Sequence, residues 1–169
     1  LKNNKLNLIY KNDLLSVNGE GEVKIKEKFE KINYLINKNR NNLNFSSNLS
    51  ITNIDLKYKK ILKNFFPKIN SSINLKDHKL DINYDNNQLS VKGFGKIKLD
   101  KKFDQINYFI NRSKDKINVS TDLILKETKF KIDDINYQKN DQVETKLTFN
   151  LDYKTNSEYQ VKNFILKEK

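Results

Sequence analysis

The sequence predicts an all-β protein, in which an antiparallel meander of long strands curls into an open groove. It also predicts two tandem units of this kind, joined by a short helical crossover. Apolar and polar residues alternate through most of the chain, which is typical of strands with one buried face. One long stretch of sequence recurs further along. Only one short segment has apolar residues at helical spacing, so no layer of helices is available to cover the sheet.

The repeat is the strongest of these signals. Residues 5–49 align without a gap on residues 79–123, and 20 of the 45 positions are identical. LSVNGEG pairs with LSVKGFG, and KFEKINYLIN pairs with KFDQINYFIN. A gapless match of this length indicates tandem structural units. We therefore expect one unit at 1–59, a crossover at 60–72, and a second unit with the start of a third at 73–169.

Each expected strand follows from its alternation. In the first unit the alternating segments are 6–10, 15–25, 32–36, 43–51 and 54–58. In the second part of the chain they are 80–84, 89–99, 106–110, 117–125, 130–132, 135–137, 143–153 and 159–166. Short clusters rich in Asn and Asp separate them, and these residues tolerate left-handed turn conformations. Short connections favour antiparallel hairpins, so each unit is expected to hold about five strands.

One segment departs from the alternation. Residues 59–72 read KKILKNFFPKINSS, with Ile61, Leu62, Phe65 and Phe66 at helical spacing. Pro67 follows, and proline disfavours helix in the residue before it. We predict a short helix here that links the two units and ends at the proline.

All four glycines of the chain lie in the two copies of one strand, at Gly19, Gly21, Gly93 and Gly95. A phosphate-binding loop would need a helix directly after the glycines, and none is expected. Glycine inside a strand marks a bend, a bulge or a place without a side chain. We predict that the glycines bend the longest strand of each unit.

Composition narrows the class of partner. The formal net charge is +12, and Cys is absent, so the chain has no disulfide or thiolate site. The lysines are spread evenly among Asn and Ile, all encoded by AT-rich codons, and no basic cluster is interleaved with exposed aromatics. We therefore predict no nucleic-acid partner. Binding of an anionic surface through the lysines stays open, with steep salt dependence as its signature. The first residue is Leu1, which suggests a fragment of a longer protein.

Three stretches resemble the AsmA/YhdP/TamB superfamily, and within it the YhdP-like, AsmA-like domain of bacterial envelope proteins. The first is the glycine strand followed by FxxINYxIN, at 19–37 and 93–111. The second is ILKNFFPKINSSINL at 61–75, which is similar to the family's helical link around a proline. The third is FKIDDINYQKNDQVETKLTFNLDY at 130–153. The family's architecture is a repeating β-groove.

The resemblance implies a segment of an elongated periplasmic groove that carries phospholipid acyl chains between the inner and outer membrane. Its parent would be anchored in the inner membrane through a segment outside this chain, and neighbouring β repeats would be partners. Inward apolar residues of the central strands would line the groove: Val17, Val23, Ile25, Phe45, Leu49, Val91, Ile97, Leu99, Val119, Leu123, Leu147 and Phe149. Plain core packing is the competing interpretation for each residue. A structural or interaction scaffold with a closed, ligand-free core is the competing function.

No pattern in the sequence indicates catalysis. His78 is the one histidine and lies in the polar stretch KDHK, so we expect a solvated loop residue. Asp133 and Asp134 are adjacent, and in a strand they would face opposite ways. No Ser/His/Asp arrangement with a nucleophile elbow is present. We predict that the protein is not an enzyme and has no cofactor and no metal site.

Overall fold

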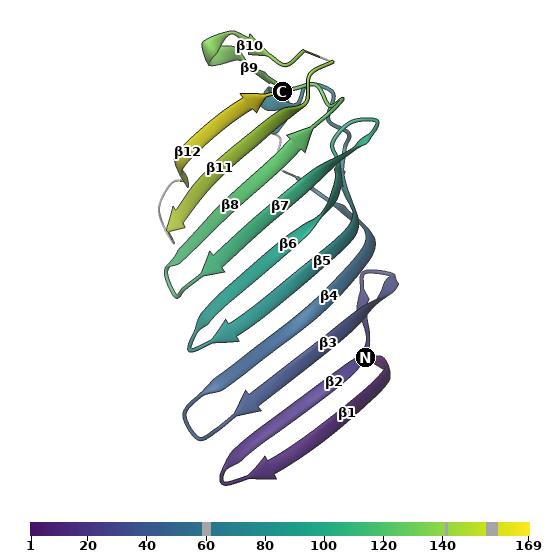
Figure 1. Cartoon of the computed structure of the whole chain (residues 1–169), viewed down its shortest axis with the longest axis vertical. Coiled ribbons are helices and arrows are strands. Elements are labelled where there is room, and N and C mark those ends of the chain that lie inside the picture. The colour runs from purple at the N-terminus through teal and green to yellow at the C-terminus, as the bar shows by residue number, and fades with distance from the viewer. Residues whose placement is uncertain (59–61, 141, 155–158) are drawn as a thin grey trace.

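The computed structural model shows a ten-stranded antiparallel sheet in which each strand pairs with the next, except that β8 pairs with β11 (Figure 1). The structure describes residues 1–58, 62–140, 142–154 and 159–169. The order across the sheet is β1-β2-β3-β4-β5-β6-β7-β8-β11-β12, and its two outer strands do not pair with each other. The predicted fold class, an open all-β groove built as a meander, is confirmed.

The strands are long, and most have 10 to 14 residues. In chain order the elements are β1 Lys2–Lys11, β2 Leu14–Ile25, β3 Lys28–Lys38, β4 Leu43–Leu56, α1 Leu62–Phe65, β5 Ile73–Asp85, β6 Gln88–Lys98, β7 Phe103–Arg112, β8 Lys116–Leu125, β9 Lys131–Ile132, η1 Asp133–Ile135, β10 Tyr137–Gln138, β11 Thr145–Lys154 and β12 Tyr159–Glu168.

Each repeat holds four strands of the sheet, β1–β4 and β5–β8, so the expectation of about five was wrong. The alternating segments 43–51 and 54–58 are not two strands, because β4 runs through both as far as Leu56. Its pairing with β5 continues past the change of phase, with Ile51 opposite His78 and Ile54 opposite Leu75. Alternation alone reads such an irregularity as a strand boundary.

Asparagine and aspartate make two of the hairpin turns, as predicted for the short polar clusters. Asn12 and Asp13 join β1 to β2, and both have positive φ, at 51° and 60°. Asn86 and Asn87 join β5 to β6 in the same way, at 44° and 65°. Two consecutive residues with positive φ define the type I′ turn, whose twist matches that of the strands it connects. These turns lie along the left-hand edge of the sheet in Figure 1.

The opposite edge carries the two long connections, and they pack on each other. The segment after β4 forms the predicted helix at 62–65, ahead of Pro67; residues 59–61 lie outside the described residues. Phe65 and Phe66 of this segment contact Phe130 of the segment after β8, with ring centroids 6.4 and 5.3 Å apart. Together with Ile69 and strand residues, Phe66 and Phe130 form the buried apolar cluster of the protein.

The segment after β8 contains a second, two-stranded sheet of β9 and β10. Asp133 and Asp134 begin the 3₁₀ turn between its strands, and both are exposed. Ile135 belongs to the same turn and is 68% exposed. Among the described residues, no helix has the length and apolar character needed to cross a membrane.

Candidate functional site

Eleven of the twelve predicted lining residues lie on one face of the ten-stranded sheet, which we call the apolar face, and Leu99 lies just past the end of β6. The strand registers show this directly. Leu8, Val17, Ile36 and Phe45 follow one another as cross-strand partners over β1–β4, and the row continues through Tyr84 and Leu89. The next row contains Val91, Ile110, Val119 and Leu151. Directly paired residues of a sheet point to the same side, so these rows form a continuous apolar stripe.

Burial divides the twelve predicted residues into two groups. Leu49, Ile97, Leu99, Leu123 and Leu147 are buried, at 9% exposure or less. The other seven are half-buried: Val17, Val23, Ile25, Phe45, Val91, Val119 and Phe149. Four of the five buried residues belong to the cluster that contains Phe66 and Phe130. The two long connections therefore cover the apolar face at one end, while none of the described residues forms a second layer over the rest of the stripe.

The burial of equivalent residues in the two repeats supports this uneven cover of the apolar face. Val23 and Ile25 occupy the same repeat positions as Ile97 and Leu99, yet the first two are half-buried and the second two are buried. At the outer strand, Leu6 and Leu8 are 58% and 56% exposed. The apolar face is thus most open over β1–β3, where neither long connection covers it.

The first glycine of each pair makes room for a tyrosine ring. Gly19 pairs with Tyr34, and Gly93 pairs with Tyr108 at the same repeat position. A Cβ on Gly93 would lie 2.3 Å from Cζ of Tyr108, and one on Gly19 would lie 2.4 Å from Cζ of Tyr34. Covering a strand glycine with a cross-strand aromatic ring is a known way of fixing register. The bend at the glycines stays a prediction; the registers of β2–β3 and β6–β7 run past them unshifted.

The second glycine of each pair lies opposite a β-bulge. Two residues of β1, Asn3 and Asn4, oppose Gly21 alone. In β5, Asp77 and His78 oppose Gly95 alone. The first residue of each bulge has positive φ, 50° at Asn3 and 54° at Asp77, a geometry that re-aims the next side chain.

The re-aimed side chains reach the tyrosines. The Tyr34 hydroxyl donates to Oδ1 of Asn4 at 3.2 Å. The Tyr108 hydroxyl lies 3.4 Å from Nδ1 of His78. Each repeat thus holds one polar pair within the apolar face, seated over its two glycines. The shared INY motif and glycines were visible in the sequence, but Asn4 and His78 differ in type, so only the structure reveals them as equivalents.

His78 is not the solvated loop residue that we expected. It lies in β5 with 1% of its surface exposed. Nε2 is 2.9 Å from the carbonyl oxygen of Lys96 and must donate to it, which leaves Nδ1 to accept from Tyr108. Burial lowers the pKa of His78 below 6.5, against smaller opposing effects of the Lys96 carbonyl and Asp77. The imidazole is therefore held neutral as part of the structure.

A second repeated feature is a buried carboxylate near the start of β3 and of β7. Glu30 and Asp104 occupy equivalent positions, and each is 3% exposed. Glu30 accepts from the amide and hydroxyl of Thr52, at 2.9 and 2.7 Å. Asp104 accepts from the amide of Lys126 at 2.8 Å and from the hydroxyl of Thr128. Burial raises the pKa of Asp104, opposed by these hydrogen bonds. Glu30 thus anchors the backbone within β4 at Thr52, and Asp104 anchors it at Lys126, just past the end of β8.

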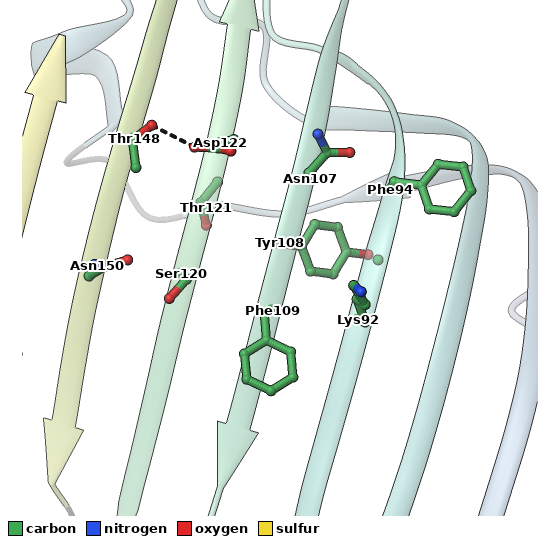
Figure 2. A pocket seen from close by; sticks show the side chains of 11 residues that line it. Lys92, Phe94, Asn107, Tyr108, Phe109, Ser120, Thr121, Asp122, Thr148 and Asn150 are labelled. Atoms are coloured by element: carbon green, nitrogen blue, oxygen red, sulfur yellow. Dashed lines mark hydrogen bonds between the residues drawn. The ribbon is translucent and has the colours of Figure 1, made fainter.

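The opposite face of the sheet is polar and carries a pocket of about 400 Å³ over β6, β7, β8 and β11 (Figure 2). Asn107, Ser120 and Asn150 lie among the exposed rings of Phe94 and Phe109. Asp122, the carboxylate of this pocket, accepts from the Thr148 hydroxyl at 2.5 Å and pairs with Lys146 at 2.9 Å. The hydrogen bond from Thr148, together with Lys146, holds its pKa below the ordinary value. Such a carboxylate is a poor general base.

Within the described part of the chain, no three His, Asp or Glu side chains are grouped so that they could hold a metal ion. The site that the structure assembles is therefore the apolar face, with one polar pair in each repeat. Comparison of the chain with family models, with curated proteins and with solved structures finds no match in any of the three. The resemblance to the AsmA/YhdP/TamB proteins rests on the sequence stretches given above.

Proposed function

We propose that this chain is a segment of an elongated β-groove that carries the acyl chains of phospholipids. The observation that carries the proposal is the apolar stripe on one face of a single-layer sheet. A stripe this long, with Leu6, Leu8 and Tyr10 each more than half exposed, needs an apolar partner, because large exposed apolar patches mark interaction sites. Acyl chains fit an unspecific aliphatic lining, since burying each CH₂ contributes roughly 0.8 kcal/mol without any directional contact.

The buried cluster at one end of the apolar face limits where a lipid chain could lie. Phe66, Ile69 and Phe130 lie over the stripe beside Ile97 and Leu99, so a chain cannot lie there unless these side chains move. We therefore place the path along the half-buried residues of the apolar face. Seven of the predicted residues remain as candidate contacts: Val17, Val23, Ile25, Phe45, Val91, Val119 and Phe149. For the five buried residues we favour core packing.

The wider setting follows from the resemblance and belongs to the same proposal: a periplasmic location, a parent protein anchored in the inner membrane, and neighbouring β repeats as partners. One feature of the sheet supports the last of these. Among the described residues, β1 pairs only with β2, and β12 pairs only with β11. Further repeats would continue the sheet by pairing with these edges, as unpaired strand edges readily accept another strand.

The test is lipid content. We would produce the chain in a bacterial periplasm, purify it without harsh detergent and measure bound lipid by native mass spectrometry. The test variant is Val17→Asp with Val91→Asp, at equivalent half-buried positions of the apolar face. The control is Asn18→Asp with Ser90→Asp, which makes the same change of charge on the opposite face of the same strands. Leu123 is unsuitable, because at 5% exposure an aspartate there tests folding.

We expect phospholipid on the parent and the control, and none on the test variant with unchanged circular dichroism. If the aspartates unfold the chain, Val17→Thr with Val91→Thr keeps residues suited to strands and is expected to lower the lipid content. A folded parent without lipid would contradict the proposal. It would favour the scaffold function instead, for which the closed cluster around Phe130 is the supporting observation.

A further inference from the structure

Each repeat places a cation in the apolar face at the C-terminal end of the same strand. Lys38 is the last residue of β3 and pairs with Leu15 on one side and Leu43 on the other. Arg112 is the last residue of β7 and pairs with Leu89 and Ile117. Both cations are exposed. Lys38 and Arg112 are 74 positions apart, so the repeat reproduces the charge as well as the apolar residues that flank it.

Neither cation is neutralised within the described residues. No ion pair or side-chain hydrogen bond joins Lys38 or Arg112 to a carboxylate there, whereas Arg40, in the turn beyond Lys38, pairs with Asp13 at 2.6 Å. Both cations lie at the edge formed by the hairpin turns, the left-hand edge in Figure 1. This edge is the one opposite the two long connections. Along β7 the apolar face therefore runs from Arg112 toward Ile106, which packs against the covered cluster. Along β3 it runs from Lys38 toward Ile32, which is not part of that cluster.

The cation at the strand end and the apolar residues behind it lie in the same order as the head group and the tails of a lipid. From Arg112 back to Ile106 along β7 the apolar face presents Ile110 and Tyr108, and six residues of strand span roughly 20 Å. An extended acyl chain lying along the strand would have its head at the guanidinium and its tail toward the cluster. Guanidinium binds phosphate through two parallel hydrogen bonds, and lysine binds it as a point charge.

We propose that Lys38 and Arg112 bind the phosphate of lipid head groups at the hairpin edge, so that the groove selects anionic diacyl lipids and holds their acyl chains along the strands, all pointing the same way. This inference rests on the proposed function and deepens it. The two sites are four strands apart, or about 19 Å at the usual spacing between strands, which leaves room for one lipid at each.

The experiment separates head group from tail. The full 169-residue chain is incubated with equal amounts of dioleoylphosphatidylglycerol and dioleoylglycerol, which have the same tails, and the lipid retained after gel filtration is quantified by mass spectrometry. The variant is Lys38→Gln with Arg112→Gln. The control is Lys31→Gln with Lys92→Gln, which removes two cations from the opposite face. The exchange Lys38→Arg with Arg112→Lys keeps both charges.

We expect the parent to retain the phosphatidylglycerol in preference to the diacylglycerol. The glutamine variant should lower that preference about threefold at each site, since each lipid loses one charge contact of about 0.7 kcal/mol. The control and the exchange variant should keep the preference. Equal retention of the two lipids by the parent, or an equal loss in the control, would overturn the inference and leave the groove standing. Retention of neither lipid would overturn both.

Discussion

Replacing Gly93 by alanine tests the account of the glycines most directly. The new Cβ would lie 2.3 Å from Cζ, 2.5 Å from Cε2 and 2.6 Å from the hydroxyl oxygen of Tyr108. These separations are far below van der Waals contact, so the ring must leave its seat and its place beside His78. The backbone adds no strain, because none of the glycines has a positive φ. The expected cost is therefore the cost of displacing one ring.

The magnitude follows from two opposing effects. Inserting a methyl group into a packed site costs about 1–3 kcal/mol. Alanine also restricts the unfolded chain, which stabilises the fold by about 0.4–1 kcal/mol where the native backbone suits it. The free energy of unfolding should thus fall by about 1–2 kcal/mol for Gly93→Ala. In a chain that already carries Tyr108→Ala the ring is gone, and the same substitution should stabilise the fold by up to about 1 kcal/mol.

The assay is equilibrium urea unfolding of the parent, the two single variants and the double variant, with the m-value checked for constancy. The reversal of sign is the decisive result. If Gly93→Ala destabilised the chain equally with and without the ring, the ring would not be the reason for the glycine, and our reasoning would be refuted. Gly19 and Tyr34 allow the same cycle in the first repeat.

Two further predictions concern the buried groups. The pKa of His78 lies below 6.5 in the folded chain, so the unfolded chain binds a proton on this imidazole more readily. The contribution of the neutral imidazole to the free energy of unfolding is therefore fully present above pH 6.5 and is lost as the pH falls below that value. His78→Asn copies the residue of the first repeat. It should reduce the fall in the free energy of unfolding between about pH 7 and pH 5, measured by urea unfolding at several pH values. The same dependence on pH in the variant and the parent would count against this role of His78. Phe130→Ala should lower the free energy of unfolding by about 3–5 kcal/mol, because Phe130 is 2% exposed. Phe94→Ala, at 49% exposure, is the control, and a similar loss in both would show that Phe130 does not hold the covered end together.

Much of the fold could be predicted from local pattern. Alternation located the strands, asparagine located the turns, and the Phe-Phe-Pro segment located the helix. The prediction failed where a strand contains an irregularity. The change of phase near Thr52 was read as a boundary, although β4 continues to Leu56. The polar neighbours of His78 suggested a loop, although a bulge in β5 turns its ring into the apolar face. Period-2 patterns assume unbroken pleating, and a bulge violates that assumption.

The sequence by itself determined the β class, the repeat and the side of each strand that is apolar, because these depend on residue type and spacing within one strand. Only the tertiary structure decided which apolar residues are covered. Ile25 and Leu99 are equivalent in the sequence pattern, yet Leu99 is buried and Ile25 is half-buried. The difference comes from Phe66 and Phe130, which lie far from Leu99 in the chain and reach it only because β4, β5, β6 and β8 are brought together in one sheet. Burial is a property of surfaces brought together by folding, and no single strand contains that information.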